Sequence, residues 1–176
     1  AIALGGSYAS GTDSFAAAIA NNTSTYGATG ANAIAIGQLA KANSSLALAI
    51  GGYNAQAIAT GAIAIGGGQG NQSSGFYSFT VGGYQAGNKA TNYNSYAVGE
   101  GANSVIQGKW AYAAAQFAAT GDAQTACVVL RNVTTTNTPT VLVSSFTGSL
   151  SASTDNQIIL PNNSAYTFSI LVVARQ

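Results

Sequence analysis

The chain has 176 residues, of which five are Lys or Arg and four are Asp or Glu, and its net charge is +1. Charged residues make up 5% of the chain, against about 25% in an average globular domain. This low and balanced charge excludes electrostatic attraction to nucleic acid or to an anionic membrane surface, and it favours an assembled extracellular protein over a soluble monomer.

A short apolar motif that closes on glycine recurs through the first hundred residues. Large and small side chains alternate within it, which is the period of a half-buried β-strand and not of a helix. The closing positions are 5, 20, 37, 51, 66, 82 and 99, so the repeat is 14 to 17 residues long. The copies are Ile2-Ala3-Leu4-Gly5, a weaker Ala17-Ala18-Ile19-Ala20, Ile34-Ala35-Ile36-Gly37, Leu48-Ala49-Ile50-Gly51, Ile63-Ala64-Ile65-Gly66, Phe79-Thr80-Val81-Gly82 and Tyr96-Ala97-Val98-Gly99.

A second, shorter alternation lies between the copies, as at Ala40 and Ala42 and again at Ala55 and Ala57. Each repeat therefore predicts two short strands and two turns. One such unit cannot bury its own apolar face, whereas stacked units can, as in solenoid proteins. We expect a β-roll or β-helix over residues 1–105 with a stacked apolar column as its structural core. The column consists of Ile36, Ile50, Ile65, Val81 and Val98.

The closing glycines are expected to be structural turn residues. The strand pattern itself does not explain so regular a glycine, so each one should need a positive φ or a close approach of neighbouring backbone. A disordered Ala/Gly linker is the alternative explanation of the composition, but linkers do not carry Ile, Leu and Val in register. The expected turn residues are Gly5, Gly37, Gly51, Gly66, Gly82 and Gly99.

The motif resembles that of a known family. Asn32-Ala33-Ile34-Ala35-Ile36-Gly37 and Gly61-Ala62-Ile63-Ala64-Ile65-Gly66 are similar to the head repeats of trimeric autotransporter adhesins. The resemblance covers about residues 1–105, although the heads of that family keep a tighter repeat. It implies a left-handed parallel β-roll that assembles as a parallel homotrimer, in which the inner faces of three chains complete the core.

Residues 106–124 are expected to form a junction, because the motif stops and the only Trp appears at position 110. Trp110, Tyr112 and Phe117 are predicted to cap the last coil, since a solenoid needs a terminal cap, and the alternative is that they stack on a ligand. The alternation of Trp110, Tyr112 and Ala114 favours a strand over a helix in this segment.

Residues 125–176 are predicted to form a separate small all-β domain. Its β-type runs are Thr125–Val133, Thr140–Phe146, Gln157–Leu160 and Tyr166–Ala174. The segments Gly121-Asp122-Ala123-Gln124, Val129-Leu130-Arg131 and Val172-Val173-Ala174-Arg175, together with residues 134–140, resemble a module of tail fibres and related structural proteins of tailed phages. Chains of that family continue past the last strand, so we expect this domain to be incomplete. The opening inside a motif likewise predicts that the sequence is part of a longer protein.

The residue types present argue against an enzyme. The chain has no His, which removes Ser-His-Asp and Cys-His sites as well as the commonest metal ligand. The four carboxylates are far apart in sequence, so a glycosidase pair is not expected. We therefore expect no catalytic residue, no metal and no cofactor. Cys127, in an apolar run, is expected to be a buried structural thiol, and no apolar run reaches the roughly 18 residues of a membrane helix.

Receptor contact is assigned to residues that follow the glycine turns. Gly51-Gly52-Tyr53-Asn54-Ala55 and Gly82-Gly83-Tyr84-Gln85-Ala86 are near copies, and Tyr8 follows a third glycine pair. In a roll these residues are expected to align along one edge, where exposed Tyr beside an amide suits contact with a sugar. The candidate binding residues are Tyr8, Tyr53, Asn54, Tyr84 and Gln85. The alternative is that they pack against neighbouring coils or chains.

Together these patterns predict an extracellular, non-enzymatic attachment protein. We expect a rigid trimeric rod in the tail fibre of a virion that presents surfaces to a glycan or protein receptor on the host cell. A trimeric adhesin head on a bacterial cell surface is the alternative, and a purely structural extracellular filament subunit is another. An ice-binding solenoid is disfavoured, because the threonines at positions 23, 25, 60 and 80 do not recur in register.

Overall fold

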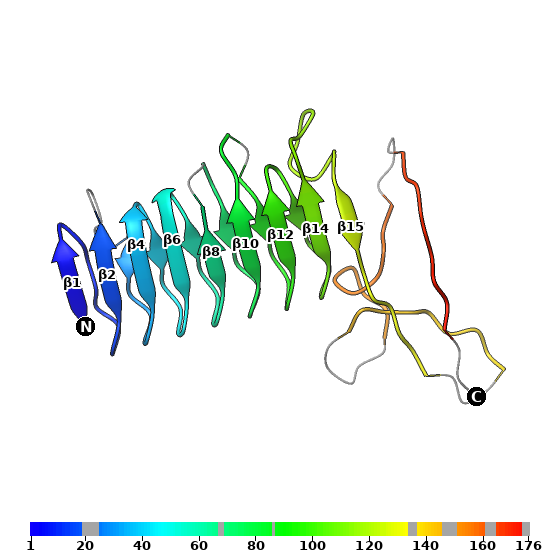
Figure 1. Ribbon diagram of the computed structural model, residues 1–176. Coiled ribbons are helices and arrows are strands. Elements are labelled where there is room, and N and C mark those ends of the chain that lie inside the picture. Colours follow the sequence, from blue (N-terminus) through cyan, green and yellow to red (C-terminus); the bar gives the residue numbers. More distant parts are fainter. Residues whose placement is uncertain are drawn as a thin grey trace.

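The computed structural model describes residues 1–18, 25–66, 69–85, 87–133, 137–145, 151–160 and 165–173. Over these residues the regular secondary structure is β only, and strands β1 to β14 wind into the parallel β-solenoid that the repeat predicts (Figure 1). A typical coil contributes one strand to a long sheet and a two-residue strand to a shorter sheet. Because neighbouring strands are about 4.8 Å apart, the stacked coils form a rod section about 35 Å long.

The long sheet has nine strands, of which the last, β15, pairs antiparallel with β14 while the others are parallel. In spatial order they are β1 (Ile2–Gly5), β2 (Phe15–Ala18), β4 (Ile34–Gln38), β6 (Leu48–Tyr53), β8 (Ile63–Ile65), β10 (Phe79–Gly82), β12 (Tyr96–Gly99), β14 (Trp110–Ala113) and β15 (Thr125–Cys127). The short sheet has six parallel strands. They are β3 (Gly27–Ala28), β5 (Lys41–Ala42), β7 (Gln56–Ala57), β9 (Gln72–Ser73), β11 (Lys89–Ala90) and β13 (Asn103–Ser104).

The interior of the solenoid is filled by small side chains. The middle residue of each motif points inward and stacks on the same residue of the next coil, and these residues are fully buried. They are Ala16, Ala35, Ala49, Ala64, Thr80, Ala97 and Ala111. The short sheet faces them with Ala28, Ala42, Ala57, Ser73, Ala90 and Ser104, which are also fully buried. The two sheets therefore lie too close together for Ile or Leu to fit between them.

The interior becomes polar in the coils that follow β8, and its polar groups are mostly paired. The hydroxyls of Ser73 and Ser78 lie 2.6 Å apart. The Asn88 amide nitrogen donates to the carbonyls of Val81 (2.8 Å) and Gly99 (2.7 Å), while its oxygen accepts the Ala102 N–H at 2.9 Å. Because buried polar groups are costly when unpaired, these bonds make a polar interior compatible with a stable coil.

Two closing glycines illustrate why a side chain is excluded at this position. Gly37 has a φ of 117°, a conformation that side chains rarely adopt, and a Cβ there would overlap the carbonyl oxygen of Gly51. Gly51 has no such φ, yet its own Cβ would overlap the carbonyl oxygen of Gly66. At Gly37 and Gly51 the stacking of successive backbones therefore leaves no room for a side chain.

The weak second copy of the motif has a different register from the one predicted. Strand β2 is Phe15–Ala18, and its pairing aligns Ala18 with Gly5. The closing residue of this coil is therefore Ala18, and the prediction of closure at Ala20 was wrong. Ile19 and Ala20 lie outside the described residues. The error arose because the alanines at positions 16 to 18 carry no alternation of size from which a register can be read.

The solenoid extends past residue 105. Strand β14 pairs in parallel with β12, so the strand predicted in the junction is confirmed, but it belongs to the solenoid. The prediction that Trp110, Tyr112 and Phe117 cap the last coil was wrong. Trp110 and Tyr112 lie on the outer face of β14 and are exposed, and Phe117 is 89% exposed in the loop that follows. The side chains of a strand point to its two faces, so Trp110 and Tyr112 do not cover the edge of β14.

The last coil is covered instead by strand β15 and by the side chain of Gln124. The Gln124 amide oxygen accepts the Asn103 N–H at 2.8 Å, and its nitrogen donates to the Asn103 carbonyl at 3.1 Å. The Gln124 amide thus forms the two hydrogen bonds with the backbone of the edge strand β13 that a further strand would form. The adjoining loop is held by Asp122, whose carboxylate accepts the N–H groups of residues 117 to 119. These bonds, led by the one from Ala118, lower the pKa of Asp122.

The region after β15 has little regular pairing. The first predicted run begins with β15, and Arg131 forms an isolated antiparallel bridge with Val143. The described parts of the other runs contain no strand, and Phe146 and Ala174 lie outside the described residues. An independent β domain in this region stays a prediction. Cys127 is exposed, contrary to expectation, because it lies on β15, the edge strand of the long sheet, which no other described strand covers.

The residue just before each long-sheet strand from β2 to β14 points inward, and in the last coil of the solenoid this residue is a lysine. The corresponding residue of earlier coils is small. Lys109 takes this place in the last coil, where it is 9% exposed, and its Nζ donates to the Asn103 carbonyl at 2.9 Å. Burial lowers the pKa of Lys109 below its ordinary value, because the ammonium group loses hydration. The residues at the corresponding position are Ser14, Ala33, Ala47, Ala62, Ser78 and Ser95.

This burial predicts that the free energy of unfolding rises with pH between the lowered pKa of folded Lys109 and its ordinary value of 10.5. In that interval the unfolded chain still binds the proton that the folded chain has released, so the slope is positive. Denaturant titrations at several pH values measure it. We expect a smaller slope for Lys109→Met, which keeps the length of the side chain without its charge. Equal slopes for the two proteins would show that the ammonium group stays hydrated.

Candidate functional site

The outer face of the long sheet is apolar along its length. The residues on either side of the inward column point outward and stack in two columns, neither of which contains a charged residue. The first is Ile2, Phe15, Ile34, Leu48, Ile63, Phe79, Tyr96 and Trp110; the second is Leu4, Ala17, Ile36, Ile50, Ile65, Val81, Val98 and Tyr112. These residues are called the apolar face below. Most are half-buried or exposed in the single chain.

The five residues predicted as a stacked core are consecutive members of the second column. Ile36 pairs with Ile50, Ile50 with Ile65, Ile65 with Val81, and Val81 with Val98. Within one chain they lie outside the alanine interior, and Ile36 is 37% exposed. Their role as a core therefore depends on other chains that cover the apolar face, and it stays a prediction about assembly.

The predicted tyrosine positions lie at the end of the coil where the long-sheet strands finish. Tyr53 ends β6 and is exposed, and Tyr84 follows β10 and is 71% exposed. Tyr8 takes a different place. The Tyr8 carbonyl accepts the Ala28 N–H at 2.9 Å, which places Tyr8 beside Gly27. Gly27 pairs with Lys41, whereas Tyr53 pairs with Gln38, three residues before Lys41. The expected alignment of Tyr8 with Tyr53 is therefore wrong, because the first coil has a shorter connection.

The two predicted amide residues make local contacts. Asn54 has a φ of 58°, and its side-chain oxygen accepts a hydrogen bond from Gln56 Nε2 at 2.7 Å, so it stabilises the turn before β7. The backbone N–H of Gln85 donates to Glu100 Oε1 at 3.3 Å, while the Gln85 side chain is exposed. The candidate residues that face solvent most openly on this edge are thus Tyr53, Tyr84 and Gln85.

A different set of aromatic residues gathers at the opposite edge, where the long-sheet strands begin. The rings of Phe76 and Tyr93 stack with centroids 5.0 Å apart and planes 9° from parallel. Tyr77, beside Phe76, has a φ of 55°, a left-handed conformation that costs a side chain about 1 kcal/mol. Its ring lies over Gly61, where a Cβ would be 2.5 Å from Tyr77 Cδ1. The three rings are 41% to 56% exposed and are called the aromatic edge below.

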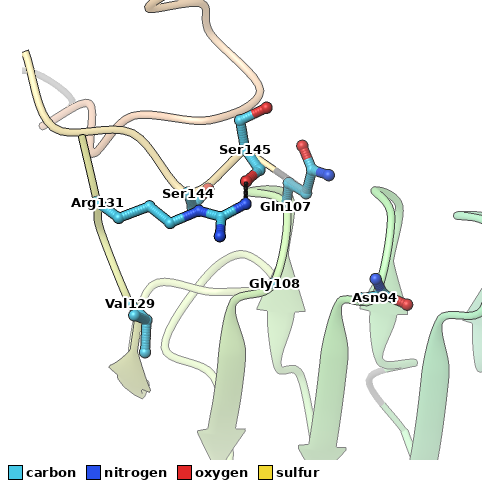
Figure 2. A pocket seen from close by; sticks show the side chains of 7 residues that line it. All are labelled: Asn94, Gln107, Gly108, Val129, Arg131, Ser144 and Ser145. Atoms are coloured by element: carbon cyan, nitrogen blue, oxygen red, sulfur yellow. Dashed lines mark hydrogen bonds between the residues drawn. The ribbon is translucent and has the colours of Figure 1, made fainter. Parts of the chain in front are cut away.

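A cavity of about 260 Å³ lies next to the aromatic edge, between the last turns of the solenoid and the segment after β15 (Figure 2). Arg131 extends across it and donates from Nη2 to the Ser145 carbonyl at 2.9 Å. The hydroxyl of Ser144 is buried and has no hydrogen-bond partner within the described residues. The lining residues are Asn94, Gln107, Gly108, Val129, Arg131, Ser144 and Ser145. Most of these residues have polar side chains, but more of the surface that lines the cavity is apolar than polar.

Neither the aromatic edge nor the cavity was predicted from the sequence. A local signal for the edge is present, since Phe76-Tyr77-Ser78-Phe79 and Tyr93-Asn94-Ser95-Tyr96 share an aromatic residue, a variable residue, Ser and an aromatic residue. The cavity has no such signal. Its residues come from positions 94 to 145, and only the return of the chain after β15 brings them together.

The described residues contain no cluster of three or more His, Cys, Asp or Glu side chains that suits a metal ion. No helix of the described part of the chain is long and apolar enough to span a membrane. Comparison with family models, with characterised proteins and with solved structures finds no match to this chain.

Proposed function

We propose that three copies of the chain pack their apolar faces together and form a rigid extracellular rod that attaches to a cell surface. The observation that carries the proposal is the apolar face itself. It runs from β1 to β14 with outward Ile, Leu, Val and aromatic side chains, and a solvated sheet face normally alternates with polar residues. Exposed apolar patches of this extent mark interfaces between proteins.

A second observation supports association between chains. The described residues 170 to 173 are Ile, Leu, Val and Val, and each is at least 75% exposed. So many exposed aliphatic side chains on an extended segment favour pairing with another chain. The number of three copies and their parallel arrangement come from the resemblance to trimeric adhesin heads.

The remaining surfaces suit a fibre in an aqueous environment. The first residue of each short-sheet strand points outward, and after Gly27 these residues are Lys41, Gln56, Gln72, Lys89 and Asn103. This face is polar, so it faces solvent when the apolar face is covered. With the resemblance of residues 121–175 to a tail-fibre module, these features favour a segment of a phage tail fibre that binds a host-cell glycan or protein without chemical turnover.

The mass of the protein in solution tests the assembly. Light scattering or sedimentation should give three times the mass of one chain under native conditions, independent of moderate dilution. A well-behaved monomer would contradict the proposal. Binding of the labelled protein to bacterial cells, followed by recovery of unchanged cell-surface polysaccharide, tests the attachment function.

Removal of Tyr53 and Tyr84, the exposed tyrosines where the long-sheet strands end, tests whether this edge contacts the receptor or the rod serves only as a spacer. We expect Tyr53→Ala with Tyr84→Ala to leave cell binding unchanged, because among the described residues neither ring stacks on another ring or lines the cavity. The measurement is binding of the labelled double variant to cells, with circular dichroism and trimer mass as controls of folding. A clear loss of binding with intact mass would instead assign receptor contact to this edge.

A further inference from the structure

The aromatic edge and the cavity form one continuous surface. The Asn94 N–H donates to the Phe76 carbonyl at 3.0 Å, and the Gly108 N–H donates to the Tyr93 carbonyl at 2.9 Å. These bonds stack the turns that precede β10, β12 and β14. Asn94 and Gly108 also line the cavity, as Figure 2 shows, so the stacked rings lie within one or two coils of it.

The backbone holds this surface rigid before any ligand is present. The hydrogen bonds between successive turns set the positions of Phe76 and Tyr93, and Gly61 provides the space that the Tyr77 ring occupies. Beyond the turns, the Gln107 N–H donates to the Asp155 carbonyl at 2.8 Å, and the Ser144 N–H donates to the Asn156 carbonyl at 2.7 Å, so residues 155 and 156 connect Ser144 to the solenoid. A rigid aromatic surface loses little entropy on binding, which favours affinity.

The chemistry of the two parts selects one class of ligand. Phe76 and Tyr93 each have one ring face covered by the other ring, and their remaining exposed parts form an uncharged apolar surface with Tyr77. The cavity is lined by Asn94 and Gln107, whose side-chain amides can donate and accept hydrogen bonds. A saccharide matches both, because its ring has an apolar face of C–H groups and an edge of hydroxyls that donate and accept hydrogen bonds.

We propose that the aromatic edge and the cavity bind an oligosaccharide, with one sugar ring packed against the exposed side of the Phe76–Tyr93 stack and a neighbouring sugar held in the cavity by Asn94 and Gln107. This inference rests on the proposed attachment function and names the class of receptor. Arg131 is the only charged residue among the described residues that line the cavity. Neutral and carboxylate-bearing oligosaccharides are therefore separate arms of the test.

The probe is a glycan array that contains neutral, uronate-bearing and sialylated oligosaccharides, applied to the assembled, labelled protein. We expect binding to at least one of these classes. Phe76→Ala with Tyr93→Ala should weaken that binding at least about tenfold, since loss of an aromatic contact costs on the order of a factor of ten in affinity. Gln107→Ala should weaken the same binding without altering the rings. Phe117→Ala is the control, because this exposed ring belongs to neither the aromatic edge nor the cavity, and it should leave the binding unchanged.

The outcomes separate this site from the attachment function. The proposed oligosaccharide site alone is overturned if the protein binds cells but no oligosaccharide on the array. It is also overturned if array binding survives both Phe76→Ala with Tyr93→Ala and Gln107→Ala. A protein that binds no cell surface overturns the attachment function. If the double aromatic variant loses its trimer mass, the rings are contacts between copies, and retained binding by Gln107→Ala would then overturn the proposal.

Discussion

Replacement of Ile65 by Asp is expected to abolish assembly while the solenoid itself stays folded. Ile65 lies near the middle of the second outward column, paired with Ile50 and Val81. When neighbouring copies cover the apolar face, the new carboxylate loses water and gains no partner, which costs several kcal/mol per chain and is repeated in each copy. Light scattering should show a single chain, with a β-type circular dichroism spectrum, because the alanine interior is unchanged.

The matched control is Gln72→Asp, which introduces the same carboxylate in the same region of the solenoid but on the outer face of the short sheet. This face is polar, so we expect the variant to keep its assembled mass. A trimeric Ile65→Asp protein would show that the apolar face is not the interface. Loss of assembly in both variants would show that the effect comes from charge alone.

Replacement of Gly51 by Val is expected to have the largest effect on stability. A Cβ at Gly51 would overlap the carbonyl oxygen of Gly66 in the next coil, and this clash involves backbone, so no rotamer relieves it. Two coils must separate or distort, and we expect the free energy of unfolding to fall by more than about 3 kcal/mol. Thermal and denaturant unfolding followed by circular dichroism measure the loss.

Gly6→Val provides the control for the change in composition. A Cβ at Gly6 meets no atom within 4 Å, and Gly6 does not have a positive φ. We expect this variant to change stability by less than about 0.5 kcal/mol, as is usual for exposed sites. Similar losses at both glycines would show that the close backbone approach at Gly51 is not what excludes a side chain there.

The repeated strands were predictable because their signals are local. Alternation with a period of two marks a strand wherever it occurs, and a glycine after each copy marks its end. The short strand of each coil was also visible, since Ala42 and Ala57 occupy the positions expected for it. Strand β2 shows the limit of this approach. Its consecutive alanines fit more than one register, and only pairing with β1 and β4 selects the observed one.

The candidate site was harder to predict for a related reason. The Tyr8, Tyr53 and Tyr84 positions look equivalent when counted from the preceding glycines, but connections of different length place Tyr8 elsewhere in its coil. Phe76 and Tyr93 stack because each lies three residues before its long-sheet strand, whereas the total length of a coil varies. Two residues are equivalent in a solenoid when they stack in successive coils. Because the loops vary in length, counting residues along the chain does not identify such pairs.

The sequence by itself determined that this protein is a β-solenoid with two strands in a typical coil, because strand period and glycine spacing are properties of neighbouring residues. It did not determine which side of each strand faces inward. A period of two places Ile36 and Ala35 on opposite faces without saying which is inside. The tertiary structure decided this, because stacked backbones bring the two sheets so close that alanine fits between them and isoleucine does not. The large residues therefore face outward and form the apolar face, which we propose that other copies of the chain cover.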